Sequence, residues 1–233
     1  MITIVTANKN GGRCISALID SLNNQTSRNF KWLVIDGDSN DNSLNIIREL
    51  SNFEFKIVSQ QDFSIYHALN IALDHIETEY YCVSGSDDFF DSDFVLNFES
   101  IINENKYDLI FGSIISNNVV IYPFVKFQFL SPVNASHSIG TIIKKSLHFK
   151  VGYYSKLYPV LADKKFVLDV LKFSNNIFYT NIVFGTYSQD GFSSLNSIDY
   201  LCDLLKLQIK SGRNTFIQTI LFFLRVVKVI LKK

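Results

Sequence analysis

Short apolar runs alternate with amphipathic segments along the first half of the chain. The apolar runs predict strands over residues 2–6, 32–35, 55–58 and 80–83. Apolar residues at helical spacing predict helices over residues 14–22, 43–50, 65–76 and 93–102. Strands and helices that alternate in this way form βαβ units, so the pattern predicts an α/β fold with a mostly parallel sheet covered on both faces.

The second half of the chain has a less regular pattern. Residues 109–116, 119–122 and 177–184 predict strands, the second of them a candidate for antiparallel pairing, and residues 164–173 predict a helix. Residues 185–196 read as a polar loop, and the aromatic stretch 126–134 fits no element.

Polar residues follow three of the predicted parallel strands where each strand ends. They are residues 6–8 after the first strand, residues 36–41 after the second, and Asp87 with Asp88 after the fourth. Ligands of parallel sheets bind beyond the carboxyl ends of the strands. The pattern therefore predicts a binding site at this rim.

Two acidic clusters at the rim each allow a structural and a functional interpretation. Asp87 and Asp88 can bind a hard divalent cation through oxygen, or form an acidic turn before a helix capped by Asp91 or Asp93. The position beside Asp36 favours the metal. The turn that begins at Asp36 can contact a nucleobase or ribose, or can simply cap the next helix, and both interpretations stay open.

Composition narrows the class of protein. The 22 basic and 22 acidic residues give no net charge, which argues against a nucleic-acid binder. Three widely spaced cysteines, Cys14, Cys82 and Cys202, indicate reduced thiols in a cytoplasmic protein, without a disulfide framework or a zinc site. The N-terminus reads as a first strand and shows no secretion signal.

Nine short motifs occur in a fixed order along the chain. They are Ile2–Asn8, Ile35–Asp41, Asp62–Asn70, Ser84–Asp88, Ser136–Ser138, Ile142–Lys145, Gly152–Tyr154, Leu161–Phe166 and Gly191–Ser193. In order and spacing they resemble glycosyltransferase family 2, most closely its bacterial branch that builds surface polysaccharides such as lipopolysaccharide or capsule. The resemblance covers about residues 1–197. It implies the GT-A fold, a Rossmann-like sheet flanked by helices, and transfer of a hexose from a nucleotide sugar.

The resemblance also implies a role for each matching residue. The residues that it places at the donor nucleotide are Thr6, Ala7, Asn8, Asp36, Asp62, Asn70 and Asp87. It implies that Asp88 holds Mg²⁺ or Mn²⁺ on the diphosphate and that Asp163 is the general base. Metal and base on opposite sides of one sugar ring suit an inverting displacement. The alternative for Asp163 is the N-cap of the following helix. His137 is a possible contact to the acceptor or a phosphate.

This chain departs from the motifs of that branch at five positions. They are Ser64, His67, Leu69, Ser138 and Asp190, which stand where the branch has Gly, Asp, Met, Gln and Gly. Since Asp88 and Asp163 are retained, these changes bear on the identity of the donor rather than on the metal or the base.

The C-terminal segment differs in charge from the rest of the chain. All 22 acidic residues lie before residue 204, whereas residues 204–233 hold seven basic residues. Residues 214–233 predict an amphipathic helix whose apolar runs are too short to span a bilayer. We expect this helix to lie in the membrane interface with Arg225 and the lysines toward anionic head groups. The alternative is packing on protein, including a dimer.

The sequence therefore predicts a GT-A domain over residues 1–197 and a helical, membrane-associated segment over residues 198–233. The expected function is inverting, metal-dependent transfer of a sugar from a nucleotide sugar to a saccharide acceptor that is lipid-linked. We expect the chain to be a peripheral protein at the cytoplasmic, inner face of the cell membrane. Two alternatives stay open: a sugar-phosphate nucleotidyltransferase, and a noncatalytic module that binds nucleotide sugar or membrane.

Overall fold

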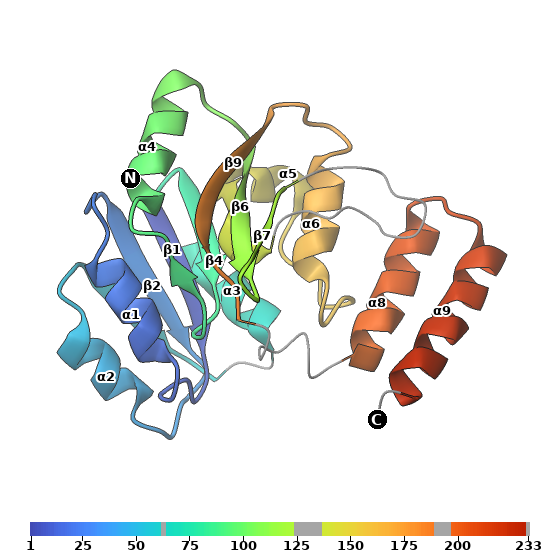
Figure 1. The fold of residues 1–233 in the computed structure, drawn as a ribbon, viewed down its shortest axis with the longest axis horizontal. Helices are drawn as coiled ribbons and strands as arrows, with labels where there is room; N and C mark the ends of the chain where they lie inside the picture. The colour runs from blue at the N-terminus through green and yellow to red at the C-terminus, as the bar shows by residue number, and fades with distance from the viewer. Residues whose placement is uncertain (62–63, 124–136, 189–196, 232–233) are drawn as a thin grey trace.

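The computed structural model describes residues 1–61, 64–123, 137–188 and 197–231. These residues form one mixed sheet with helices on both faces and a pair of helices at the C-terminal end (Figure 1). Predictions that concern Asp62, residues 126–134, Asp190, the last motif and the two final lysines lie outside the described residues.

Four parallel strands form the half of the sheet that the sequence predicts best, in the order β3-β2-β1-β4. They are β1 (Ile2–Asn8), β2 (Phe30–Asp36), β3 (Phe55–Ser59) and β4 (Tyr80–Ser84). The connecting helices are α1 (Ile15–Asn23), α2 (Ser43–Leu50) and α3 (Ile65–His75). Every predicted element of this half is confirmed, because each has the apolar periodicity of its own type.

The other half of the sheet mixes parallel and antiparallel strands. Its strands are β5 (Phe89–Phe90), β6 (Leu109–Ser116), β7 (Val119–Ile121), β8 (Thr141–Lys144) and β9 (Ile177–Thr186). β8 runs antiparallel to both β4 and β6 and so joins the two halves, β6 is parallel to β9, and β7 is antiparallel to β6. The sequence pattern misses β5 and β8, because two and four residues are too few to show a period.

Neighbouring residues of β1 face opposite sides of the sheet and so reach two separate cores. Ile4 packs in the core that includes α1 and α4 (Phe94–Glu104). Val5 packs in the core that includes α3 and α6 (Ala162–Val170). The helix predicted over residues 164–173 is α6, which begins two residues earlier than predicted and ends at Val170. The short α5 (His148–Val151) lies beside α6.

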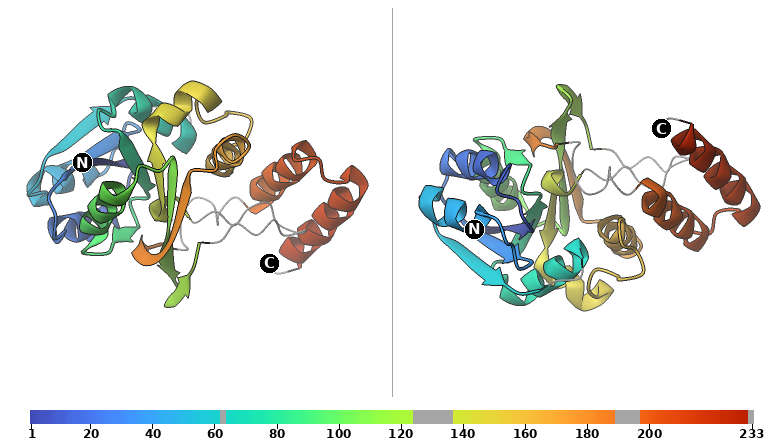
Figure 2. Two further views of the ribbon diagram at one scale, coloured as in Figure 1. Left: turned by 90° about the horizontal axis from the view of Figure 1, so that it is seen from above. Right: turned by 90° about the horizontal axis from the view of Figure 1, so that it is seen from below.

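Two C-terminal helices, α8 (Ser197–Lys210) and α9 (Thr215–Ile230), lie side by side at one end of the molecule, as all views show (Figure 2). Leu204 and Leu207 of α8 join the core of α3 and α6. α9 contacts α8, and within the described part of α9 only Gln218 is buried. Of the helices that the structure describes, none has the length and hydropathy to span a membrane.

Candidate active site

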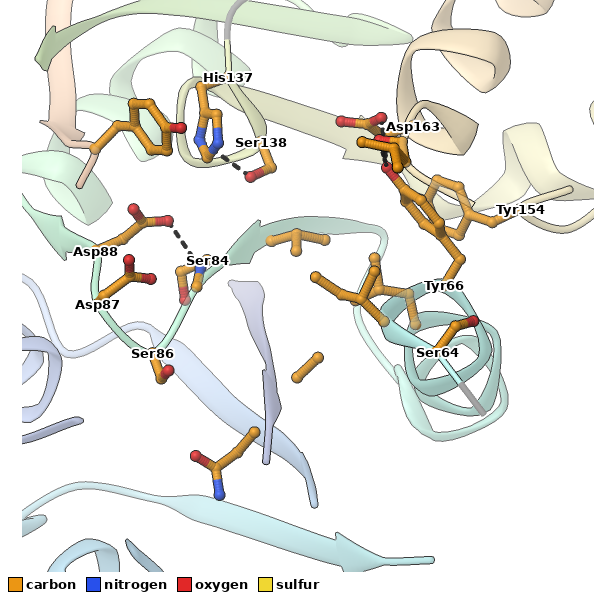
Figure 3. Close-up of a pocket in the computed structure, with 18 of the residues that line it drawn as sticks. Ser64, Tyr66, Ser84, Ser86, Asp87, Asp88, His137, Ser138, Tyr154 and Asp163 are labelled. Atoms are coloured by element: carbon orange, nitrogen blue, oxygen red, sulfur yellow. Dashed lines mark hydrogen bonds between the residues drawn. The ribbon is translucent and has the colours of Figure 1, made fainter. Parts of the chain in front are cut away.

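A cleft of about 1010 Å³ opens at the carboxyl ends of β1 and β4, where the sequence predicts a site. One wall consists of the end of β1 and the turn Ser84–Asp88 that follows β4. The opposite wall consists of the N-terminal ends of α3 and α6, together with Tyr200 of α8. His137 and Tyr187 line the cleft as well (Figure 3). A cleft of this size can enclose a ligand of several rings.

Asp88 is the most deeply buried carboxylate of the cleft, with a residue exposure of 1%. Its Oδ2 accepts a hydrogen bond of 2.8 Å from the Gly85 N–H, and its Oδ1 accepts one of 3.4 Å from the Ser188 N–H. Burial raises the pKa of the Asp88 carboxyl to about 7 although the Gly85 N–H lowers it, and the neighbouring charge of Asp87 raises it further. The hydrogen bonds that this carboxylate accepts come from backbone N–H groups, so a bound cation would stabilise its ionised form.

The turn around Asp88 suits a divalent cation. A Cβ on Gly85 would lie 2.6 Å from Oδ1 of Asp87 and 3.3 Å from Oδ2 of Asp88, so the glycine leaves the carboxylates uncovered. Carboxylate oxygens are the ligands that Mg²⁺ and Mn²⁺ prefer. Over the described ranges no group of three His, Cys, Asp or Glu side chains comes together, so a cation here would need ligands from its substrate or from water.

Asp163 lies on the opposite side of the cleft from Asp88 (Figure 3). It is half-buried, and its Oδ1 lies 2.8 Å from the Tyr66 hydroxyl, which lies equally close to the Val160 carbonyl oxygen. The N-cap of α6 is Leu161, so Asp163 lies inside the first turn. The alternative that Asp163 is the N-cap is therefore wrong, and its second oxygen is not used for capping.

A buried carboxylate from α8 takes over the task of fixing the start of α6. Oδ2 of Asp203 accepts hydrogen bonds from the backbone N–H groups of Val160, at 2.9 Å, and Leu161, at 3.2 Å. Asp203 is fully buried and pairs with Lys206 through its other oxygen. The wall that carries Asp163 is therefore held by α8, more than thirty residues further along the chain.

The polar residues at the ends of β1 and β2 form a buried network. Oδ1 of Asp36 accepts a hydrogen bond of 2.9 Å from Asn8, while both of its oxygens accept hydrogen bonds from Ser39. The Thr6 hydroxyl contacts Ser84 and accepts a hydrogen bond from Trp32. Ala7 and Asn8 line the cleft, whereas Thr6 and Asp36 are not part of its lining. The predicted contacts of Thr6 and Asp36 with a nucleoside stay a prediction, and in this structure both side chains support the rim.

Asn70 also supports the cleft from behind. Its amide exchanges two hydrogen bonds with the backbone of Tyr154, at 3.0 and 2.9 Å. This pair fixes Tyr154, which lines the cleft, to α3. Asn70 is not among the residues that line the cleft, and its predicted contact with the donor stays a prediction.

His137 lies in the cleft with its ring stacked on Tyr187 at a centroid distance of 3.8 Å. Burial lowers the pKa of His137 to about 4. The ring is therefore neutral at pH 7 and can accept or donate a hydrogen bond, but it offers no charge to a phosphate.

The sequence analysis assigns no role to several residues that line or support this site. Tyr66 lies within the motif Asp62–Asn70, four residues before Asn70. This spacing places the two residues on one face of the predicted helix, which is a signal that the sequence does contain. Lys164 stands next to Asp163, and its ammonium lies 5.6 Å from the centroid of the Tyr200 ring. Tyr200 and Asp203 lie beyond the last motif, and no local sequence pattern predicts that α8 packs beside the cleft.

Comparison with known proteins agrees with this geometry. The family described as Glycosyl transferase family 2 matches residues 2–161. A "PGL/p-HBAD biosynthesis glycosyltransferase" of Mycobacterium tuberculosis is 25% identical over 210 residues, which are 85% of this chain and 81% of that protein. A "UDP-Glc:alpha-D-GlcNAc-diphosphoundecaprenol beta-1,3-glucosyltransferase" of Escherichia coli is 28% identical over 54% of this chain and 51% of its own length.

A solved structure shares the fold at low sequence identity. The mannosyltransferase PcManGT of Pyrobaculum calidifontis, solved with GDP-Man and Mn²⁺, superimposes with a TM-score of 0.69 at 15% identity. The match covers 91% of this chain and 64% of that one, so this chain spans somewhat less than two thirds of its length.

Proposed function

The chain belongs to glycosyltransferase family 2 and has the GT-A fold, and from this premise we propose that it moves a sugar from a nucleotide sugar to a lipid-linked saccharide, with inversion at the transferred carbon. The observation that carries the proposal is the placement of Asp88 and Asp163 on opposite walls of one cleft. An inverting displacement needs charge compensation at the leaving group and a base on the opposite face of the sugar. The family membership makes the chain a transferase and argues against the nucleotidyltransferase and noncatalytic alternatives.

The wall of Asp88 is suited to the donor. Asp88 would hold Mg²⁺ or Mn²⁺, and Asp87 beside it would face the sugar or the ribose. When bound, such a cation offsets the charge that grows on the departing nucleoside diphosphate. Ala7 and Asn8 would line the nucleoside end, on the rim that the network of Asp36 keeps rigid. The related structure that was solved with a nucleotide sugar and Mn²⁺ supports this assignment by its fold.

The wall of Asp163 is suited to the acceptor. Asp163 would take the proton from the acceptor hydroxyl as that oxygen attacks the sugar. The Tyr66 hydroxyl, 2.8 Å from Oδ1, orients the carboxylate and leaves Oδ2 for the acceptor. Tyr66 is buried, so this orientation is fixed before the substrate binds.

The surface of α9 supports a lipid-linked acceptor and a peripheral position at the inner face of the membrane. Its exposed large side chains, between 39% and 81% exposed, are Phe216, Ile217, Ile220, Phe223, Leu224, Val227, Ile230 and Leu231. Gln218 is instead buried, and Arg225 lies 3.5 Å from Gln208 of α8. Arg225 is thus half-buried beside α8, whereas Lys228 is exposed and the large apolar side chains are turned outward. The expected contact of Arg225 and the lysines with head groups stays a prediction.

An outward apolar stripe with only basic residues beside it fits an anionic membrane better than a second copy of the chain. Residues 204–233 contain no acidic residue, so two copies of this segment would bring like charges together. In this proposal residues 1–197 carry the chemistry and residues 198–233 place it at the membrane, with α8 also lining the cleft.

The test is a transfer assay on the full chain with a panel of nucleotide sugars, lipid-linked saccharide acceptors and Mn²⁺. We expect acceptor-dependent release of a nucleoside diphosphate, its loss in EDTA, and an inverted anomeric configuration in the product by NMR. Asp88→Asn and Asp163→Asn should each lower kcat by about 10³-fold without changing the unfolding temperature. Full turnover by both variants, or a product with retained configuration, would contradict the proposal.

A further inference from the structure

Two lysines line the cleft, Lys9 on the side of Asp88 and Lys164 on the side of Asp163, and Lys164 is the one beside the proposed base. Lys165, Lys172 and Lys206 each form an ion pair with an aspartate. Within the described ranges no carboxylate lies within ion-pair distance of Lys164, although Lys164 lines the cleft beside Asp163. The contact that the structure gives it is the face of the Tyr200 ring, at 5.6 Å. A half-buried ammonium that meets a ring and no anion is available for an anionic ligand.

Lys164 lies on the wall opposite the proposed binding site of the donor diphosphate. Asp87 and Asp88, which suit the donor, line the opposite wall. Lys164 directly follows Asp163 in the first turn of α6 and lines the same cleft, so an anion bound by Lys164 lies near the hydroxyl that faces Asp163.

Tyr200 completes the subsite from a different part of the chain. It lies in α8, is partly buried against the core of α3 and α6, and lines the cleft. The ammonium of Lys164 lies over its ring, 5.6 Å from the centroid. α9, which packs on α8, presents the exposed apolar stripe. A ligand that carries a sugar, a phosphate and a lipid in that order would match these three features.

We propose that Lys164 and Tyr200 form an acceptor subsite for the phosphate of a lipid-linked sugar, in which the sugar that faces Asp163 itself bears the phosphate. The proposal rests on the proposed function for the identity of the acceptor end. It adds that the acceptor is a monosaccharide phosphate rather than a longer chain whose phosphate lies several sugars away.

The test is calorimetric binding to the full chain in EDTA, so that no cation at Asp88 can attract a diphosphate. The probes are a hexose 1-diphosphate esterified to farnesol and the matching farnesyl hexoside without phosphate. We expect the wild-type chain to bind the diphosphate at least about tenfold more tightly than the hexoside. This ratio should fall to near one in Lys164→Met.

Matched variants separate the subsite from general effects of charge and folding. Lys165→Met removes the neighbouring cation, which pairs with Asp169, and should keep the tenfold ratio. Tyr200→Phe retains the ring face and should keep the ratio, whereas Tyr200→Leu should lower it. Unfolding temperatures of all variants identify any that fail to fold, and Lys164→Gln serves as a second neutral variant in that case.

Three outcomes overturn the proposal. The first is that the wild-type chain binds the two probes equally or binds neither. The second is that the ratio of the two affinities is unchanged in Lys164→Met. The third is that Lys164→Met loses as much affinity for a nucleoside diphosphate as for the phosphate-bearing probe, which would assign the cation to the donor. The binding test does not depend on turnover. If phosphate binding depends on Lys164 but no transfer occurs with any donor, the subsite stands and the proposed function fails. Transfer without the phosphate preference gives the reverse result.

Discussion

The two walls of the cleft are built in different ways. The wall of Asp88 is a strand followed by a short turn, and the shorter hydrogen bond to its carboxylate, at 2.8 Å, comes from Gly85 of that turn, while the longer one, at 3.4 Å, comes from the distant Ser188. The wall of Asp163 is assembled from α3, α6 and α8, since Tyr66 and Asp203 reach it from 97 and more than 40 residues away. The wall of Asp88 thus depends mainly on local structure, whereas the wall of Asp163 depends on tertiary packing.

This difference has a consequence for how the two walls can vary. A turn closed by its own backbone tolerates change elsewhere in the chain. A wall closed by α8 is sensitive to the C-terminal hairpin of α8 and α9, which also carries the apolar stripe. The wall of Asp163 is therefore linked through α8 to the surface that we propose to meet the membrane.

The largest expected effect separates the chemistry of the two walls. Asp88→Asn should remove Mn²⁺-dependent binding of a nucleoside diphosphate by about 10²-fold or more, because the neutral amide is a weak ligand for a hard cation. Asp163→Asn should retain this binding while transfer is lost. Calorimetry with and without Mn²⁺ measures both. Equal loss of nucleotide binding in the two variants would show that nucleotide binding is not specific to the wall of Asp88.

The next effect tests whether α8 holds the acceptor wall. Asp203→Ala should lower the free energy of unfolding by about 2–4 kcal/mol, because two buried backbone N–H groups lose their acceptor. Urea unfolding measures the change. Lys206→Ala removes only the half-exposed partner of Asp203 and should cost less than about 1 kcal/mol. A small effect of Asp203→Ala would mean that α6 begins correctly without α8.

A substitution on the outer side of α9 tests the link to a membrane. Phe223 is 60% exposed, so Phe223→Asp should leave the unfolding temperature unchanged while weakening binding to vesicles of anionic phospholipid by about tenfold or more. Co-sedimentation with anionic and with neutral vesicles measures this. Asn214→Asp, at the helix N-cap, adds the same charge away from the stripe and is the control. Unchanged sedimentation of the Phe223 variant would point to packing on protein instead.

The last prediction concerns pH. The pKa of Asp88 is raised to about 7, so a growing fraction of this carboxyl is protonated as the pH falls below 7, and a proton competes with the cation. The affinity for Mn²⁺ should therefore decline by up to about tenfold per pH unit between pH 7 and pH 5, and should level off above pH 8. Titrations of Mn²⁺ at several pH values test this. A flat profile would show that Asp88 is not the ligand.

The parallel half of the fold was predictable because it obeys local rules. The elements from β1 to β4 were each recognised from a short apolar run or a helical period, and their strand ends located Asp88 correctly. Asp163 was found through a resemblance of motifs rather than through periodicity. The same motif contained Lys164, but its lack of an anionic partner depends on where Asp169 and Asp203 point, which no spacing in the sequence expresses.

The sequence by itself determined the α/β fold, because residues close along the chain set strand and helix periods and the turns between them, while its ordered motifs indicated the family and the two candidate carboxylates. Only the tertiary structure decided that Asp36 and Asn70 support the cleft from behind, that Asp203 and Tyr200 of α8 complete the wall of Asp163, and that α9 turns its apolar side outward. These outcomes depend on which side of a helix packs against a distant element. That choice is made by the burial of side chains across the whole fold, and for α9 it placed Gln218 inside and Phe223 outside.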